Sequence, residues 1–173
     1  MRILNLFLFL TLSFATFGQT KNPFLKLKFD KVVFYDFEGI GEKGSQIVDN
    51  NGKSVQKVIK QVQLDTSTIS KLNLKLGDRK SYGNVTASCF DPHCGFVYFL
   101  NGKPVAQILI CIDCNRLRSD IDIPAKKQGK QGTGADAYYI ADGLSKSMRK
   151  FINGLLLKHK FTHQIELGSS FDK

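Results

Sequence analysis

Tryptophan is absent from this chain of 173 residues, and cysteine, proline and histidine are scarce, with four, four and three copies. No group of residues forms a recognisable catalytic signature. The glycine-rich stretch 125–134 lacks the Gly-x-x-x-x-Gly-Lys-Ser/Thr order that cradles phosphate, so we expect a mobile surface loop there. Internal repeats are also missing. These absences favour a protein that is not an enzyme.

Long apolar stretches are missing after the N-terminus, so no later segment is expected to cross a membrane. At the N-terminus, Arg2 precedes a Leu- and Phe-rich run over residues 3–17, which predicts a signal peptide, residues 1–18, cleaved after Gly18 or one residue later. The run is short for a membrane anchor, and no cysteine beside it supports a lipid-modified N-terminus. We therefore expect an exported protein, periplasmic or secreted, with one domain over residues 19–173.

The chain is basic, with 25 Lys and Arg against 15 Asp and Glu and a formal charge of +10. Arg2 is the only charge in the predicted signal peptide, so the mature chain stays strongly positive. Such a balance suits anionic partners, for example an anionic cell-surface polymer. Because the lysines are scattered rather than striped, a solvated basic surface is the favoured interpretation, and no specific nucleic acid is expected.

The periodicity of apolar residues predicts the first half of the fold. Residues 31–37 are β-branched and aromatic and predict a strand, and a second strand is expected to end near Leu64. Asp65 can cap a helix that ends at Gly77. The predicted apolar face of this helix comprises Ile69, Leu72 and Leu76. A loop is expected to follow over residues 78–84.

The second half contains a strong hairpin signal, in which apolar runs over residues 96–100 and 104–112 flank Asn101-Gly102. Residues 137–141 suggest a short strand, and residues 142–161 have the spacing of an amphipathic helix. The polar tail after His163 is expected to fray. The predicted fold class is therefore α+β: a small single domain in which an antiparallel sheet with a central hairpin packs against two helices.

All four cysteines lie beside this hairpin, in two clusters. They are Cys89, Cys94, Cys111 and Cys114. In the register of a two-residue turn, Cys89 lies opposite Cys114. The same register sets Cys94 opposite Leu109 and places Cys111 diagonal to Cys94 on the same face. Both clusters should therefore meet at the open end of the hairpin.

Structural disulfides are the favoured interpretation, because an exported chain meets an oxidising compartment and the cysteine count is even. The register favours Cys89–Cys114 together with Cys94–Cys111. Two other connectivities are compatible with four cysteines.

A zinc site is the first alternative, since Cys-x4-Cys followed by Cys-x2-Cys approximates a zinc ribbon. His93 could replace Cys94, so that Cys89, His93, Cys111 and Cys114 form a Cys3His set. A thiol-redox pair, Cys111-x-x-Cys114, is the second alternative, although it follows a strand rather than starting a helix. With the disulfide interpretation no cofactor is expected. His159 and His163 are spaced for metal binding, but solvated side chains are expected.

The segments Cys-Phe-Asp-Pro-His over residues 89–93 and Ile-Cys-Ile-Asp-Cys-Asn-Arg-Leu over residues 110–117 resemble a group of uncharacterised exported bacterial proteins. These proteins carry a Cys-Phe-x-Pro-x-His segment followed by Ile-Cys-x-x-Cys, and the resemblance covers roughly residues 78–125. It implies a site built from Cys89, His93, Cys111 and Cys114, with Cys94 less typical. No activity is assigned to that group, so the resemblance implies none.

Overall fold

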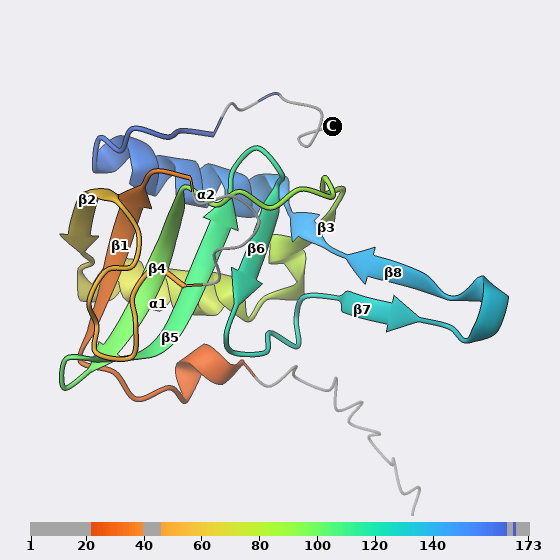
Figure 1. The fold of residues 1–173 in the computed structure, drawn as a ribbon, viewed down its shortest axis with the longest axis horizontal. Helices are drawn as coiled ribbons and strands as arrows, with labels where there is room; N and C mark the ends of the chain where they lie inside the picture. The colour runs from red at the N-terminus through yellow and green to blue at the C-terminus, as the bar shows by residue number, and fades with distance from the viewer. Residues whose placement is uncertain (1–21, 40–45, 166–167, 169–173) are drawn as a thin grey trace, which may run out of the picture.

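The computed structural model describes residues 22–39, 46–165 and 168 (Figure 1). The predicted signal peptide lies outside the described residues. Over the described ranges, no helix is both long and apolar enough to span a membrane.

An antiparallel five-stranded sheet forms the centre of the molecule, in the order β2-β1-β4-β5-β6. Its strands are β1 (Lys31–Phe37), β2 (Val58–Gln63), β4 (Cys94–Leu100), β5 (Lys103–Cys111) and β6 (Arg116–Ser119). β1 and β4 lie inside the sheet and are buried on both faces, and valine, phenylalanine and tyrosine make up most of their residues. The predicted strand over residues 31–37 and the predicted hairpin are both confirmed, whereas β6 was not predicted.

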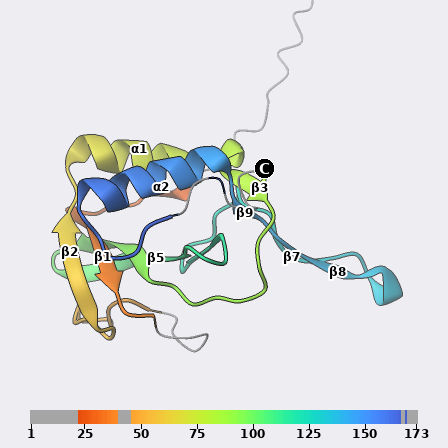
Figure 2. The same cartoon turned by 90° about the horizontal axis from the view of Figure 1, so that it is seen from above.

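Two helices, α1 (Thr66–Leu76) and α2 (Lys146–Lys158), lie side by side across one face of the sheet (Figure 2). Asp65 caps α1 as predicted, with Oδ1 accepting a hydrogen bond from the Thr68 amide at 2.8 Å. α2 begins later than expected, because residues 143–144 form a strand and Ser145 supplies the cap instead. The sheet and its helices confirm the α+β class.

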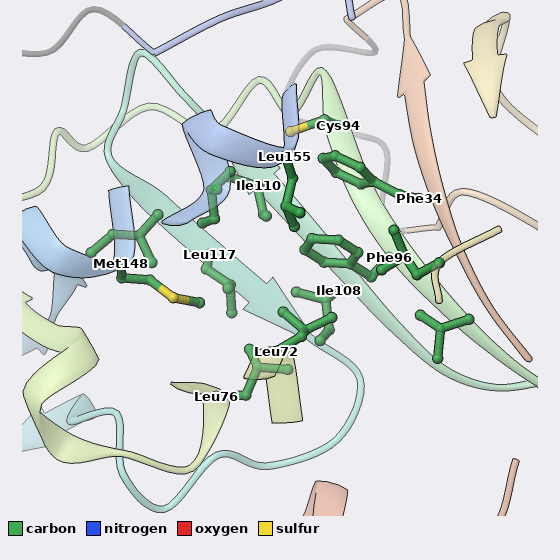
Figure 3. Packing of buried hydrophobic residues seen from close by; sticks show 14 of the residues in the cluster. Phe34, Leu72, Leu76, Cys94, Phe96, Ile108, Ile110, Leu117, Met148 and Leu155 are labelled. Atoms are coloured by element: carbon green, nitrogen blue, oxygen red, sulfur yellow. The ribbon is translucent and has the colours of Figure 1, made fainter. Parts of the chain in front are cut away.

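The main core fills the space between the helices and the sheet (Figure 3). The rings of Phe34 and Phe96 stack there with centroids 4.4 Å apart, and Tyr98 donates a hydrogen bond to Asn73 Oδ1 at 2.7 Å. Burial raises the pKa of Tyr98 well above its usual range. A buried hydroxyl with a partner of this kind fixes α1 on the sheet at little desolvation cost.

The opposite face of the sheet is covered by loops rather than by helices. Its apolar residues form a second core, called here the loop-side core, which includes Phe37, Ile47, Phe90, Leu109, Cys111 and Cys114. Gln107 holds one covering loop: its side-chain oxygen accepts from the amides of Ile47 and Val48, and its nitrogen donates to the Val48 carbonyl. Because all of these bonds are buried, the loop lies in one fixed position.

Two small ribbons complete the structure. β3 (Tyr82–Asn84) pairs with β9 (Gly143–Leu144), and β7 (Gln128–Gln131) pairs with β8 (Tyr138–Ala141). The β7–β8 ribbon projects from the body of the molecule (Figure 1). β8 confirms the predicted short strand. The expectation of a loop over residues 125–134 is corrected, since β7 lies within it. The expected loop over residues 78–84 likewise holds a 3-10 turn, Arg79–Ser81, as well as β3.

The segment after α2 is ordered further than expected. Ile165 is buried, and its amide donates to the Asn153 side-chain oxygen at 3.0 Å. The predicted fraying therefore does not apply to residues 164–165, and the chain beyond them lies outside the described residues apart from residue 168.

Candidate functional site: a three-cysteine cluster

Three of the four cysteines converge at the open end of the hairpin. The sulfur atoms of Cys89, Cys111 and Cys114 all lie within 4.8 Å of one another. Cys114 is in bonding contact with both of the others, and the Cα–Cα separations of 5.9 Å to Cys89 and 5.3 Å to Cys111 are those of disulfide partners. Because a sulfur forms one disulfide at a time, Cys114 can bond to either neighbour and leaves the third sulfur unbonded. We call these residues the sulfur cluster.

A tight turn after β5 brings Cys111 and Cys114 together. Asn115 adopts a left-handed conformation with φ of 51°, which asparagine tolerates, and its amide bonds the Ile112 carbonyl at 3.2 Å. The chain then reverses into β6, where Arg116 pairs with Cys111. Within the turn, the Cys114 amide donates to Cys111 Sγ at 3.3 Å. The turn therefore sets the spacing of the Cys-x-x-Cys pair.

Cys89 reaches the cluster from an extended loop over residues 85–93. The Cys114 carbonyl accepts from the Thr86 hydroxyl at 2.8 Å and from the Ala87 amide at 3.0 Å. Asn115 donates to the Val85 carbonyl at 2.9 Å. The loop is thus bound to the Cys114 turn by hydrogen bonds before any disulfide is counted.

The cluster is only partly accessible. Cys111 and Cys114 are buried in the loop-side core, whereas Cys89 is exposed. The apolar surroundings of Cys111 and Cys114 disfavour a thiolate at these two sulfurs. Cys89 is the sulfur through which solvent or a reductant would reach the bond.

Cys94 lies apart from the cluster, on the helix side of the sheet. Its side chain is fully buried beside Phe34, Phe96 and Leu155 (Figure 3), and it forms no disulfide. Burial, with a smaller contribution from Asp36, raises the pKa of its thiol well above the usual range. Cys94 is therefore an inert core residue, and the expected Cys94–Cys111 disulfide is not found.

A bulge in the hairpin causes this difference from the expected register. Leu100 pairs with Lys103 as a two-residue turn requires, but Phe99 then pairs with Pro104 and Tyr98 with Ala106. Val105 is the extra residue, next to a proline that cannot donate to the ladder. Cys94 consequently lies opposite Ile110 rather than Leu109. A slip of one residue exchanges the two faces of a strand, so Cys94 and Cys111 point to opposite sides of the sheet.

His93 is not a member of the sulfur cluster. Its ring packs against the ring of His163, with centroids 4.3 Å apart. His163 Nδ1 lies 2.9 Å from Asp36 Oδ1, and the other oxygen of this buried carboxylate accepts from the Thr162 amide at 2.6 Å. His163 is thus not the solvated side chain that was expected. Asp36 fastens the segment after α2 to β1, and its place within an apolar strand was the sequence signal for that role.

His159, the other histidine of the pair, lies at the end of α2 and does not share a site with His163. Desolvation and the neighbouring Lys158 lower its pKa. Its Nε2 is buried and has no hydrogen-bond partner within the described part of the chain. The two histidines therefore have different surroundings despite their helical spacing.

The sulfur cluster supplies three ligands of the kind that zinc prefers. Structural zinc sites have four protein ligands. Across residues 22–39 and 46–165, no histidine or carboxylate joins the three sulfurs within the distance that a shared ion requires. The fit to zinc is therefore incomplete, and the Cys3His arrangement with His93 does not form.

In comparisons with protein-family models, with curated proteins and with solved structures, this chain finds no match.

Proposed function

We propose that this is an exported, non-enzymatic protein in which the sulfur cluster is a disulfide staple between Cys89 and Cys114. The observation that carries the proposal is the convergence of three sulfurs where the loop over residues 85–93 meets the Cys114 turn. The bond joins residues 25 apart in sequence, whereas Cys111–Cys114 would join residues only three apart. A longer closed loop removes more entropy from the unfolded chain, so Cys89–Cys114 is the more stabilising of the two bonds.

Export rests on the predicted signal peptide and on the resemblance to exported bacterial proteins. An oxidising compartment would form the staple and maintain it. The test is secretion of the full chain by a bacterial host, followed by N-terminal sequencing of the product. A mature protein that begins at residue 19 or 20 supports export, whereas an intact N-terminus retained in the cytoplasm contradicts it.

A second candidate function is thiol–disulfide exchange, which is favoured by the position of Cys114 between two partners. The Cys111 thiolate would attack Cys114 Sγ, the Cys89–Cys114 bond would break, and Cys89 would leave as a thiolate. This step needs no external oxidant because the number of disulfides is unchanged. Cys89 would then be an exposed thiol able to react with a disulfide of another molecule.

Counting thiols in the purified protein distinguishes the alternatives. The staple predicts two alkylatable cysteines in denaturant without reductant, four after reduction, and no stoichiometric zinc. A native protein in which Cys89 becomes alkylated at the same rate as an unstructured thiol would favour exchange. Bound zinc with four free thiols would contradict both proposals and support a metal site.

A further inference from the structure

The β7–β8 ribbon and the edge strand β6 enclose a groove that the sulfur cluster does not use. The groove has a volume of about 540 Å³, and its lining includes Arg116, Arg118, Lys126 and Tyr139. Asp122 is the one carboxylate among the lining residues. Three cations therefore line this groove together with one anion. Figure 1 shows that the β7–β8 ribbon, which supplies Tyr139, projects from the body of the molecule.

Contacts within the fold fix the side chains of two of these cations, Arg118 and Lys126. The guanidinium of Arg118 lies over the Phe90 ring at 3.9 Å. Lys126 is buried, and its ammonium donates to the Leu117 carbonyl at 2.6 Å and to Gln128 Oε1 at 2.8 Å. A preorganised group loses little entropy when a ligand binds to it.

Arg116 has a donor that the described residues leave without a partner. Its Nη1 donates to the Ser88 carbonyl at 3.3 Å, but its Nε is buried and has no hydrogen-bond partner among the described residues. A buried polar group without a partner is costly, and guanidinium donors suit carboxylate, sulfate and phosphate oxygens. The Nε itself is shielded from solvent, so a ligand in the groove would meet the outer end of the guanidinium. Two arginines in one groove point to an anionic ligand.

A second groove lies next to this one and shares two of its lining residues, so a ligand longer than a single ion could contact both. Arg116 and Tyr139 also line a neighbouring groove of about 440 Å³, whose other wall is the loop over residues 85–88. Tyr139 is 66% exposed and lies between the two grooves. The exposed ring of Tyr139 provides an apolar surface on which a sugar ring can pack. The neighbouring cations supply hydrogen-bond donors for acidic groups on that sugar.

We propose that this double groove binds an acidic polysaccharide. Arg116, Arg118 and Lys126 would hold its sulfate or carboxylate groups, and Tyr139 would pack against a sugar ring. Nucleic acid is the less favoured polymer, because Tyr139 is the one aromatic side chain among the described residues that line the groove, whereas successive bases stack on a series of aromatic side chains.

The test is calorimetric titration of the full mature chain with a heparin oligosaccharide, at about 50 mM and about 200 mM salt. The wild type should bind and should lose affinity at the higher salt concentration. Arg116→Gln should weaken binding by about tenfold, and Tyr139→Ala by about threefold. Because Tyr139 is exposed, its substitution tests the groove even if the arginine variant folds poorly.

Lys103→Gln is the matched control, since Lys103 is exposed at the start of β5, at the end of the strand away from Cys111, and its loss changes the net charge equally. This variant should bind within about twofold of the wild type, as a remote exposed charge contributes little. Three results would overturn the proposal: no binding at low salt, an equal loss in Lys103→Gln and Arg116→Gln, or equally tight binding of single-stranded DNA at the same site.

Discussion

At the residue scale, Cys114 has a different role from its two neighbours because every bond in the sulfur cluster passes through it. Cys114→Ser removes whichever disulfide Cys114 forms, and we expect it to lower the free energy of unfolding by about 3.5 kcal/mol, the loop-closure value for residues 25 apart. Cys111→Ser leaves the Cys89–Cys114 bond intact, so it should lower the free energy of unfolding much less than Cys114→Ser does. Urea unfolding of the three oxidised proteins measures both effects.

Reduction is the control for this comparison. Under reducing conditions the difference between wild type and Cys114→Ser should almost disappear, since neither then has a disulfide. If Cys111→Ser destabilises the oxidised protein as much as Cys114→Ser does, Cys111–Cys114 is the bond that forms and the staple proposal is wrong.

Lys126 gives the groove a pH dependence. Burial, together with Arg116 and Arg118 and against an opposing contribution from Asp142, lowers the pKa of Lys126 to about 8. Above that pH the ammonium loses its charge, so heparin affinity should fall as the pH rises from 7 to 9. Lys126→Arg stays protonated. That variant should show a flatter profile, and an unchanged fall would contradict the role of Lys126.

The lowered pKa of Lys126 also affects the free energy of unfolding, which should rise with pH where the heparin affinity falls. Between about pH 8 and the usual lysine pKa, the unfolded chain holds a proton on Lys126 that the folded chain has lost. The contribution of Lys126 to the free energy of unfolding therefore rises with pH in this window. Weaker binding in that range would consequently not reflect destabilisation by this residue.

At the scale of elements, two glycines test how tightly the strands and helices pack. A Cβ on Gly95, in β4, would meet the Ile108 carbonyl oxygen and would lie 2.6 Å from Ile47 Cδ1. Gly95→Ala should therefore destabilise the protein by about 1–3 kcal/mol. Gly154, which is exposed in α2, has nothing within 4 Å of such a Cβ. Gly154→Ala should stabilise by about 0.5–1 kcal/mol. Melting temperatures of the two variants test both expectations. Equal shifts in melting temperature would contradict the close packing at Gly95.

The elements that sequence periodicity predicted are those whose own residues decide their structure. Residues 31–37 are apolar enough to require a buried strand, and Asp65 with Gly77 marks the two ends of α1. β6 and β7 were missed because arginine, lysine, glutamine and glycine carry little strand preference. Both form only because a partner strand supplies the hydrogen bonds.

The site was predicted in part, and a single residue explains the error. The hairpin correctly brought Cys89 to Cys114, but the bulge at Val105 reversed the faces of Cys94 and Cys111. Such bulges depend on tertiary packing, and the sequence signal here was only the proline beside it. Likewise Arg116 and Lys126 gained significance only when the fold placed them in one groove.

At the scale of the whole molecule, the sulfur cluster and the proposed binding groove share a wall. The loop that Cys89 fastens to Cys114 is also the loop over residues 85–88 that lines the second groove. Reducing the disulfide should loosen this wall and weaken heparin binding by a few-fold, whereas Cys94→Ala should have no such effect. Titrations before and after reduction test this link, and an unchanged affinity would contradict it.

The most direct test of the staple is disulfide mapping without reductant, using a protease that cleaves before aspartate. Cuts before Asp91 and Asp113 place Cys89 and Cys114 on separate peptides, residues 78–90 and 113–119, while Cys94 and Cys111 share residues 91–112. With the Cys89–Cys114 staple, peptides 78–90 and 113–119 are joined and peptide 91–112 carries two free thiols. A disulfide within peptide 91–112, joining Cys94 to Cys111, would contradict the prediction that both of these thiols are free. It would also contradict the register, which places the two side chains on opposite faces of the sheet.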